Sequence, residues 1–204
     1  MLLFSLLSGA SAAEISIQLV DKKGRGVSAA YVELVAKNGT HRVSPGKGVI
    51  DQVDKEFVPL VSMVPKGSTV SFPNSDNIQH QIYSFSKAKK FDLPLFATDE
   101  SKTITFDQAG IVKMGCNIHD WMLSYLYVRE SQFLVNSDDK GMASFSGVPA
   151  GDYQLRIWSP RMKSNGDFVG RDVTVIDTAN PLITQELKVR KKIRKKPRIE
   201  DEAY

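Results

Sequence analysis

The sequence feature that most constrains this chain is the nine-residue stretch Met114–Met122, which contains its only cysteine. Within it, His119 follows Cys116 after three positions, and Met122 follows after three more. A thiolate, an imidazole and a thioether together suit copper, because the monovalent ion favours sulfur and the divalent ion favours imidazole. A trigonal copper site with a weak axial methionine needs a second imidazole. The fold must therefore bring a distant histidine to this loop.

His80 is the candidate for that second imidazole. It follows an alternating segment, Val70–Asn74, and a polar turn rich in Asn and Asp, and it opens a second alternating run. The predicted metal ligands are therefore His80, Cys116, His119 and Met122. Met114 lies two residues before Cys116 and would share its strand face, so it stays open as an alternative axial ligand, as does a site without one.

These segments resemble the cupredoxins, the blue-copper electron carriers such as plastocyanin and amicyanin. The resemblance is carried by the Asn-rich turn before His80, by the late Cys-x2-His-x2-Met loop, and by Val64–Asn74, which is similar to the early strands of the family. It extends over about residues 47 to 129. It implies an all-β Greek-key sandwich or barrel with one type 1 copper ion, in which Met122 is the axial ligand and the other three are equatorial.

Three positions depart from the common cupredoxin pattern. Gly115 stands where an aromatic residue often precedes the cysteine, and Asp120 stands where proline often follows the second histidine. Gln81 replaces the asparagine that commonly ties the two ligand loops together, and its longer side chain could make the same link. Such outer groups orient the ligands and tune the metal.

The N-terminus predicts export. Met1–Leu7 is apolar, and the next residues up to Ala13 are mostly small, as a signal peptidase requires. We therefore expect a signal peptide over residues 1–13 and a periplasmic protein. The apolar run is too short to span a membrane.

Two further regions resemble the halves of a carboxypeptidase-regulatory-like or transthyretin-like β-sandwich. The first contains alternating runs at 14–20 and 30–35, and the second contains a Pro-x-Gly-x-Tyr turn at Pro149–Tyr153. The predicted organisation is one small sandwich split between 14–40 and 131–190, with a cupredoxin domain, 41–130, inserted between its strands. The alternative is a cupredoxin with an N-terminal extension and a separate C-terminal domain.

The complete arrangement resembles a group of exported bacterial proteins described as methylamine-utilisation or plastocyanin-like proteins. Segments outside the ligand loops that carry this resemblance are Ile50–Gln52, Phe91–Leu93 and Ile157–Arg161. The name of the group implies a pathway, but it does not establish one for this chain.

The net charge of +4 comes from the C-terminus. Lys188–Arg198 contains eight basic residues, whereas the rest of the chain is close to neutral. A similar run at Lys87–Lys90 is expected to be a solvated loop, with steering of an acidic redox partner as the alternative. We predict that residues 191–204 form a disordered tail that binds no nucleic acid, and which could contact an anionic membrane surface or an acidic partner.

The ligand set predicts a non-enzymatic carrier of single electrons between redox partners, such as a c-type cytochrome or a periplasmic dehydrogenase. A multicopper oxidase needs many more histidines than the three of this chain, His41, His80 and His119. Two alternatives remain open. The same ligands would serve a periplasmic copper chaperone or sequestration protein, and the small sandwich could make the chain a non-redox binding module.

Overall fold

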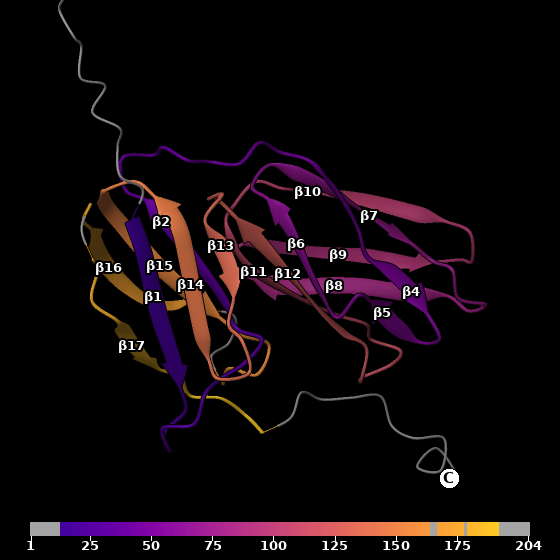
Figure 1. The fold of residues 1–204 in the computed structure, drawn as a ribbon. Helices are drawn as coiled ribbons and strands as arrows, with labels where there is room; N and C mark the ends of the chain where they lie inside the picture. Colours follow the sequence, from indigo (N-terminus) through magenta and orange to yellow (C-terminus); the bar gives the residue numbers. More distant parts are fainter. Residues whose placement is uncertain (1–12, 164–166, 178, 192–204) are drawn as a thin grey trace, which may run out of the picture. The chain divides into compact units, whose positions relative to one another are not determined.

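The computed structural model describes residues 13–163, 167–177 and 179–191, and these form strands and loops without a helix (Figure 1). The prediction of an all-β fold is confirmed. The described residues contain no helix that is long and apolar enough to cross a membrane. Apart from Ala13 and Lys191, the predicted signal peptide and basic tail lie outside the described residues.

The described chain divides into two compact units. The small unit combines residues 13–40, 133–157 and 170–187, and the large unit combines residues 41–132, 158–169 and 188–191. The small unit is therefore built from segments on both sides of the large one in the sequence.

The small unit contains two sheets, with strand orders β14-β1-β17 and β13-β2-β15-β16. Their bounds are β1 (Ala13–Val20), β2 (Tyr31–Ala36), β13 (Leu134–Asn136), β14 (Met142–Val148), β15 (Gly151–Trp158), β16 (Val169–Val175) and β17 (Ile183–Glu186). Alternate residues of β1, such as Ile17 and Leu19, are fully buried, and so are Leu155 and Ile157 of β15. Alternation places these side chains on one face of each sheet, where they form the core.

The large unit contains sheets with strand orders β10-β7-β3 and β6-β12-β11-β8-β9, and a hairpin of β4 and β5. The bounds are β3 (Lys47–Val49), β4 (Asp51–Val53), β5 (Glu56–Val58), β6 (Val61–Pro65), β7 (Ser68–Pro73), β8 (His80–Ser86), β9 (Lys89–Phe96), β10 (Ser101–Phe106), β11 (Gly110–Gly115) and β12 (Leu123–Arg129). β6 pairs with β12 in parallel and β3 with β7 in parallel, while the other strand pairs of the two larger sheets are antiparallel.

The core of the large unit includes the predicted ligand loop. The rings of Phe72, Phe91 and Phe106 lie 6.2 to 6.5 Å apart, centroid to centroid, with Phe72 and Phe106 fully buried and Phe91 packed against them. Cys116 and Met122 belong to the same cluster of buried residues. A loop that packs into a close-packed interior has little freedom to rearrange, because neighbouring side chains occupy the space around it.

The two ends of the longest segment of the large unit, residues 41–132, are hydrogen-bonded to each other. Val43 N donates to Glu130 O at 3.2 Å, Gln132 N donates to His41 O at 2.9 Å, and Arg42 and Ser131 form a β-bridge between these contacts. Insertion of one domain into another requires such neighbouring ends. Assignment of the small unit to the carboxypeptidase-regulatory-like family stays a prediction.

Residues 158–163 and 167–169, which the sequence-based boundaries place in the small unit, group instead with the large unit. The reason is aromatic packing on β12. Trp158 lies 5.2 Å from Tyr125 and 6.3 Å from Tyr127, and Phe168 lies 5.1 Å from Tyr127, measured between ring centroids.

The prediction of a solvated loop over Lys87–Lys90 is wrong in its bounds, because only Lys87 and Ala88 lie outside the strands. Lys87 and Ala88 form the turn between β8 and β9, and Lys89 already belongs to β9. Ala88 is buried, because this turn packs closely on Gly110.

Replacement of Phe72 by alanine tests this core. Phe72 is fully buried in the large unit, so Phe72→Ala should lower the free energy of unfolding by about 3–5 kcal/mol. The chain has two tryptophans, Trp121 and Trp158, and both lie in the large unit, so their fluorescence during urea unfolding reports on that unit. Phe85→Ala is the control, because Phe85 is 79% exposed and its loss should have little effect. Equal effects of the two substitutions would contradict the assigned core.

Candidate metal centre

Strand register brings the two parts of the candidate site together. β11 ends at Gly115, directly before Cys116, and β8 begins at His80. The two strands are antiparallel neighbours, with Gly115 opposite Tyr83. The end of β11 therefore lies beside the start of β8, and the loop that carries His119 continues from this edge.

His80, Cys116 and His119 form a cluster that could hold a metal ion. One ligand atom from each residue lies within 4.8 Å of the others. All three side chains are buried, at 0%, 3% and 8% exposure respectively. The imidazole rings lie 5.1 Å apart between centroids, at an angle of 58°. The structure thus brings together three of the four predicted ligands, although they come from segments about forty residues apart in the sequence.

The hydrogen bonds of His80 define which nitrogen faces the cluster. Nε2 lies 2.9 Å from Oδ2 of Asp76. Nδ1 is buried and has no hydrogen-bond partner among the described residues. When Nε2–H donates to the carboxylate, Nδ1 carries the lone pair that a metal requires.

The Asp76 carboxyl group supports this tautomer. Burial raises its pKa, but hydrogen bonds from His80 and from the backbone N–H groups of Lys55 and Asn77 outweigh burial, so the pKa is lowered overall. Asp76 is then ionised near neutral pH. An ionised carboxylate only accepts hydrogen bonds, so the hydrogen must lie on Nε2 of His80.

His119 is held by the loop that follows Cys116. Its carbonyl oxygen accepts a 3.0 Å hydrogen bond from Met122 N, and its ring lies 5.2 Å from that of Trp121, centroid to centroid. Nδ1 of His119 is a buried nitrogen for which the described residues provide no hydrogen bond, like Nδ1 of His80. The same nitrogen of both rings is therefore suited to ligation.

The two candidate axial ligands are both close-packed in the core. Met122 is 2% exposed and Met114 is 1% exposed, and both belong to the buried cluster that contains Cys116. Met122 as axial ligand stays a prediction, with Met114 as the alternative.

Gln81 links the ligand loop to two strands. Its Oε1 accepts a 2.7 Å hydrogen bond from Asn117 Nδ2, and its Nε2 donates to Asp92 Oδ1 at 2.5 Å. Gln81 lies in β8, Asp92 lies in β9, and Asn117 directly follows Cys116. The longer side chain thus joins the ligand loops in the way that the sequence suggested.

Sequence reasoning missed Asp76, although a signal was present. Asp76 precedes His80 by four positions in the polar turn, and a carboxylate beside a ligand histidine is a common outer partner. The role of Lys55 had no sequence signal, because its contacts at the site are made by its backbone N–H and C=O groups.

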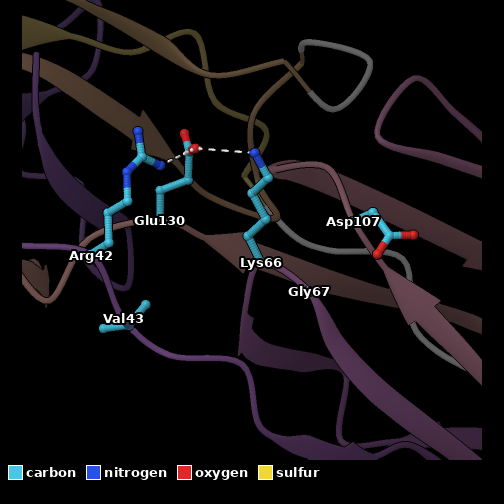
Figure 2. A pocket seen from close by; sticks show the side chains of 6 residues that line it. All are labelled: Arg42, Val43, Lys66, Gly67, Asp107 and Glu130. Carbon is cyan, nitrogen blue, oxygen red and sulfur yellow. Dashed lines mark hydrogen bonds and ion pairs between the residues drawn. The ribbon is translucent and has the colours of Figure 1, made fainter. Parts of the chain in front are cut away.

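A separate pocket of about 400 Å³ lies elsewhere on the large unit (Figure 2). Arg42 Nη1 lies 2.9 Å and Lys66 Nζ 3.7 Å from Oε1 of Glu130, and Asp107 completes the charged lining. The formal charges of the two basic and two acidic side chains that line this pocket sum to zero. None of the predicted metal ligands lines this pocket.

No family model matches the chain, and no curated protein sequence matches it. Similar solved structures include a purple cupredoxin from Nitrosopumilus maritimus, which is 24% identical over 40% of this chain and 99% of its own, with a TM-score of 0.37. A copper-containing nitrite reductase (NirK) from Thermus scotoductus SA-01 is 26% identical over 43% of this chain and 23% of its own, with a TM-score of 0.40. A reduced Cu(I) form of an amicyanin mutant is 20% identical over 50% of this chain and 99% of its own, with a TM-score of 0.39.

The glycine before the cysteine makes a testable steric prediction. A Cβ atom on Gly115 would lie 2.8 Å from the hydroxyl oxygen and 2.9 Å from Cζ of Tyr83. Gly115→Ala should therefore lower the free energy of unfolding by about 1–3 kcal/mol, because the ring must move. In a Tyr83→Ala background the same substitution should lower the free energy of unfolding by less, and urea unfolding of both pairs of variants measures the difference.

The matched control is Gly46→Ala, because a Cβ there would meet nothing within 4 Å. An unchanged cost of Gly115→Ala in the Tyr83→Ala background would show that Tyr83 is not the obstacle.

Proposed function

We propose that the large unit is a cupredoxin domain that binds one type 1 copper ion through His80, Cys116, His119 and Met122. The observation that carries the proposal is the convergence of a cysteine sulfur and two imidazoles within 4.8 Å in a buried site. Nδ1 of His80 strengthens it, because a buried nitrogen without a hydrogen bond among the described residues is costly unless a metal binds it.

The donor set fits copper. One sulfur and two imidazole nitrogens suit both oxidation states of copper, whereas magnesium and calcium prefer oxygen ligands. A buried methionine nearby would complete the set as a weak axial ligand. A bound copper ion would alternate between its monovalent and divalent states and so carry one electron.

The protein's own groups would prepare the site for this chemistry. Cys116 must lose its thiol proton on metal binding, and Asp76 holds the Nε2 hydrogen of His80 away from the metal. The surrounding core keeps the ligands in one arrangement. A geometry that changes little between oxidation states favours rapid electron exchange.

The exposure of the ligands suggests where a redox partner would bind. His119 is 8% exposed while His80 is fully buried, so His119 is the imidazole closer to solvent. Ile118, next to it, is 50% exposed. We infer that the surface around His119 and Ile118 binds a redox partner such as a c-type cytochrome or a periplasmic dehydrogenase.

The wider proposal is a periplasmic, non-enzymatic electron carrier within a methylamine-utilisation-protein-like family. Among the described residues, one group of His, Cys, Asp and Glu side chains converges in this way, and His41 is not part of it. The apolar N-terminal stretch supports export, and the basic C-terminal run could contact an anionic membrane surface rather than nucleic acid.

Copper loading tests the proposed site. The protein mixed with Cu(II) should show an intense visible charge-transfer band from the Cys116 thiolate, together with a narrow copper hyperfine splitting in paramagnetic resonance. Cys116→Ser should abolish the band, because the thiolate is lost. His41→Ala is the control and should leave both spectra unchanged, since His41 lies outside the cluster.

Two outcomes would overturn electron transfer. A protein that binds only Cu(I) and stays colourless would favour a copper chaperone or sequestration protein. A protein that binds no copper would favour a binding module.

Substitution of the two methionines distinguishes the axial ligands. With Met122 as the axial ligand, Met122→Leu should shift the reduction potential and the visible spectrum, because a weak ligand is removed while the volume is nearly kept. Met114→Leu should change stability slightly and leave the potential in place. Voltammetry of both variants is the measurement, and the reverse result would assign Met114.

A further inference from the structure

The turn of the β4–β5 hairpin has an unusual backbone. Asp54 and Lys55 connect the two strands, and both have positive φ angles, 51° and 58°. A residue with a side chain rarely adopts this conformation, because its Cβ then lies too close to the backbone. Contacts around the turn must therefore hold it in place.

The backbone N–H of Lys55 reaches the first ligand histidine through Asp76. It donates a 2.7 Å hydrogen bond to Oδ2 of Asp76. The same oxygen lies 2.9 Å from Nε2 of His80. One carboxylate oxygen thus joins the hairpin turn to the His80 ring.

The backbone carbonyl of Lys55 reaches the second ligand histidine through Trp121. Nε1 of Trp121 donates a 3.0 Å hydrogen bond to Lys55 O. The Trp121 ring lies 5.2 Å from the ring of His119, between centroids, at an angle of 50°. The two backbone groups of one residue are therefore linked to both imidazoles.

The base of the hairpin is anchored independently of these contacts. Ser75 Oγ donates to Asp51 Oδ2 at 2.8 Å, and Gln52 Nε2 donates to Pro73 O at 3.0 Å. Phe57 belongs to the buried core. The turn consequently projects from a fixed support toward the site.

We propose that the Lys55 backbone is a positioning clamp for the metal centre. It holds Asp76 against His80 and Trp121 against His119. Lys55 precedes Asp76 by 21 residues and Trp121 by 66 residues in the sequence. The clamp makes the orientations of the two rings depend on each other. This inference rests on the proposed function for the identity of the ligands, but its contacts exist without a metal.

The clamp uses only the backbone of Lys55, so its side chain is dispensable. Lys55→Gly keeps both hydrogen-bonding groups and tolerates positive φ. This variant should preserve the clamp, and it therefore serves as the matched control for variants that break it.

The decisive variant is Trp121→Phe, which keeps an aromatic ring beside His119 and removes the Nε1–H donor. In the metal-free full chain, NMR should show that amide exchange of Lys55 becomes about tenfold faster, as expected for the loss of one supporting hydrogen bond. The Nε2–H signal of His80 should also exchange faster, although none of the hydrogen bonds of Trp121 involves His80 directly. After Cu(II) loading, the copper hyperfine splitting should change.

Two further variants keep the test sharp. Benzothienylalanine at position 121 replaces the N–H by sulfur and keeps the size of the ring, so it removes the hydrogen bond without loosening the core. It should reproduce the result of Trp121→Phe. Gln81→Ala breaks the separate link to Asn117 and should leave Lys55 exchange unchanged.

Unchanged exchange of Lys55 and of His80 Nε2–H in both tryptophan variants would overturn the clamp. An equal effect of Lys55→Gly or Gln81→Ala would also overturn it, because general loosening of the loops would then explain the result. These readouts need no metal, so failure of the clamp and failure of copper binding are distinguishable.

Discussion

The close approach of one cysteine sulfur and two imidazoles in a buried site is the constraint on which the large unit depends. Burying His80, Cys116 and His119 together leaves Nδ1 of His80 without a hydrogen bond among the described residues. A buried polar atom in this state costs about 1–3 kcal/mol. The fold tolerates that cost because the surrounding sheets are close-packed, and a ligated metal would remove it.

Two separate devices keep the ligands in place. On one side, Gln81 joins Asn117 to Asp92 and so ties the ligand loop to β8 and β9. On the other side, the β4–β5 hairpin reaches both rings through hydrogen bonds to Asp76 and Trp121. The site is thus held by hydrogen bonds from β8, β9 and the β4–β5 hairpin, as the proposed copper centre would require if it is to keep one geometry in two charge states.

The neighbouring ends of the large unit explain how one chain can contain both units. Hydrogen bonds join residues 41–43 to residues 130–132, so the segment 41–132 of the large unit begins and ends at nearly the same point. The strands on either side then pair, as β1 does with β14 and β2 with β13. An interruption of this kind disturbs few contacts of the host sandwich.

The sequence by itself determined the all-β class and the candidate ligands His80, Cys116 and His119, because alternation and ligand spacing are local properties. The link through Gln81 was suggested only by the resemblance to cupredoxins. Only the tertiary structure decided that Trp158 and Phe168 pack on β12, that Asp76 orients His80, and that the Lys55 backbone is linked to both histidines through Asp76 and Trp121. These features depend on register and on backbone conformation between distant segments. Backbone N–H and C=O groups are the same in every non-proline residue, so their placement is decided by folding and is not visible in residue identity.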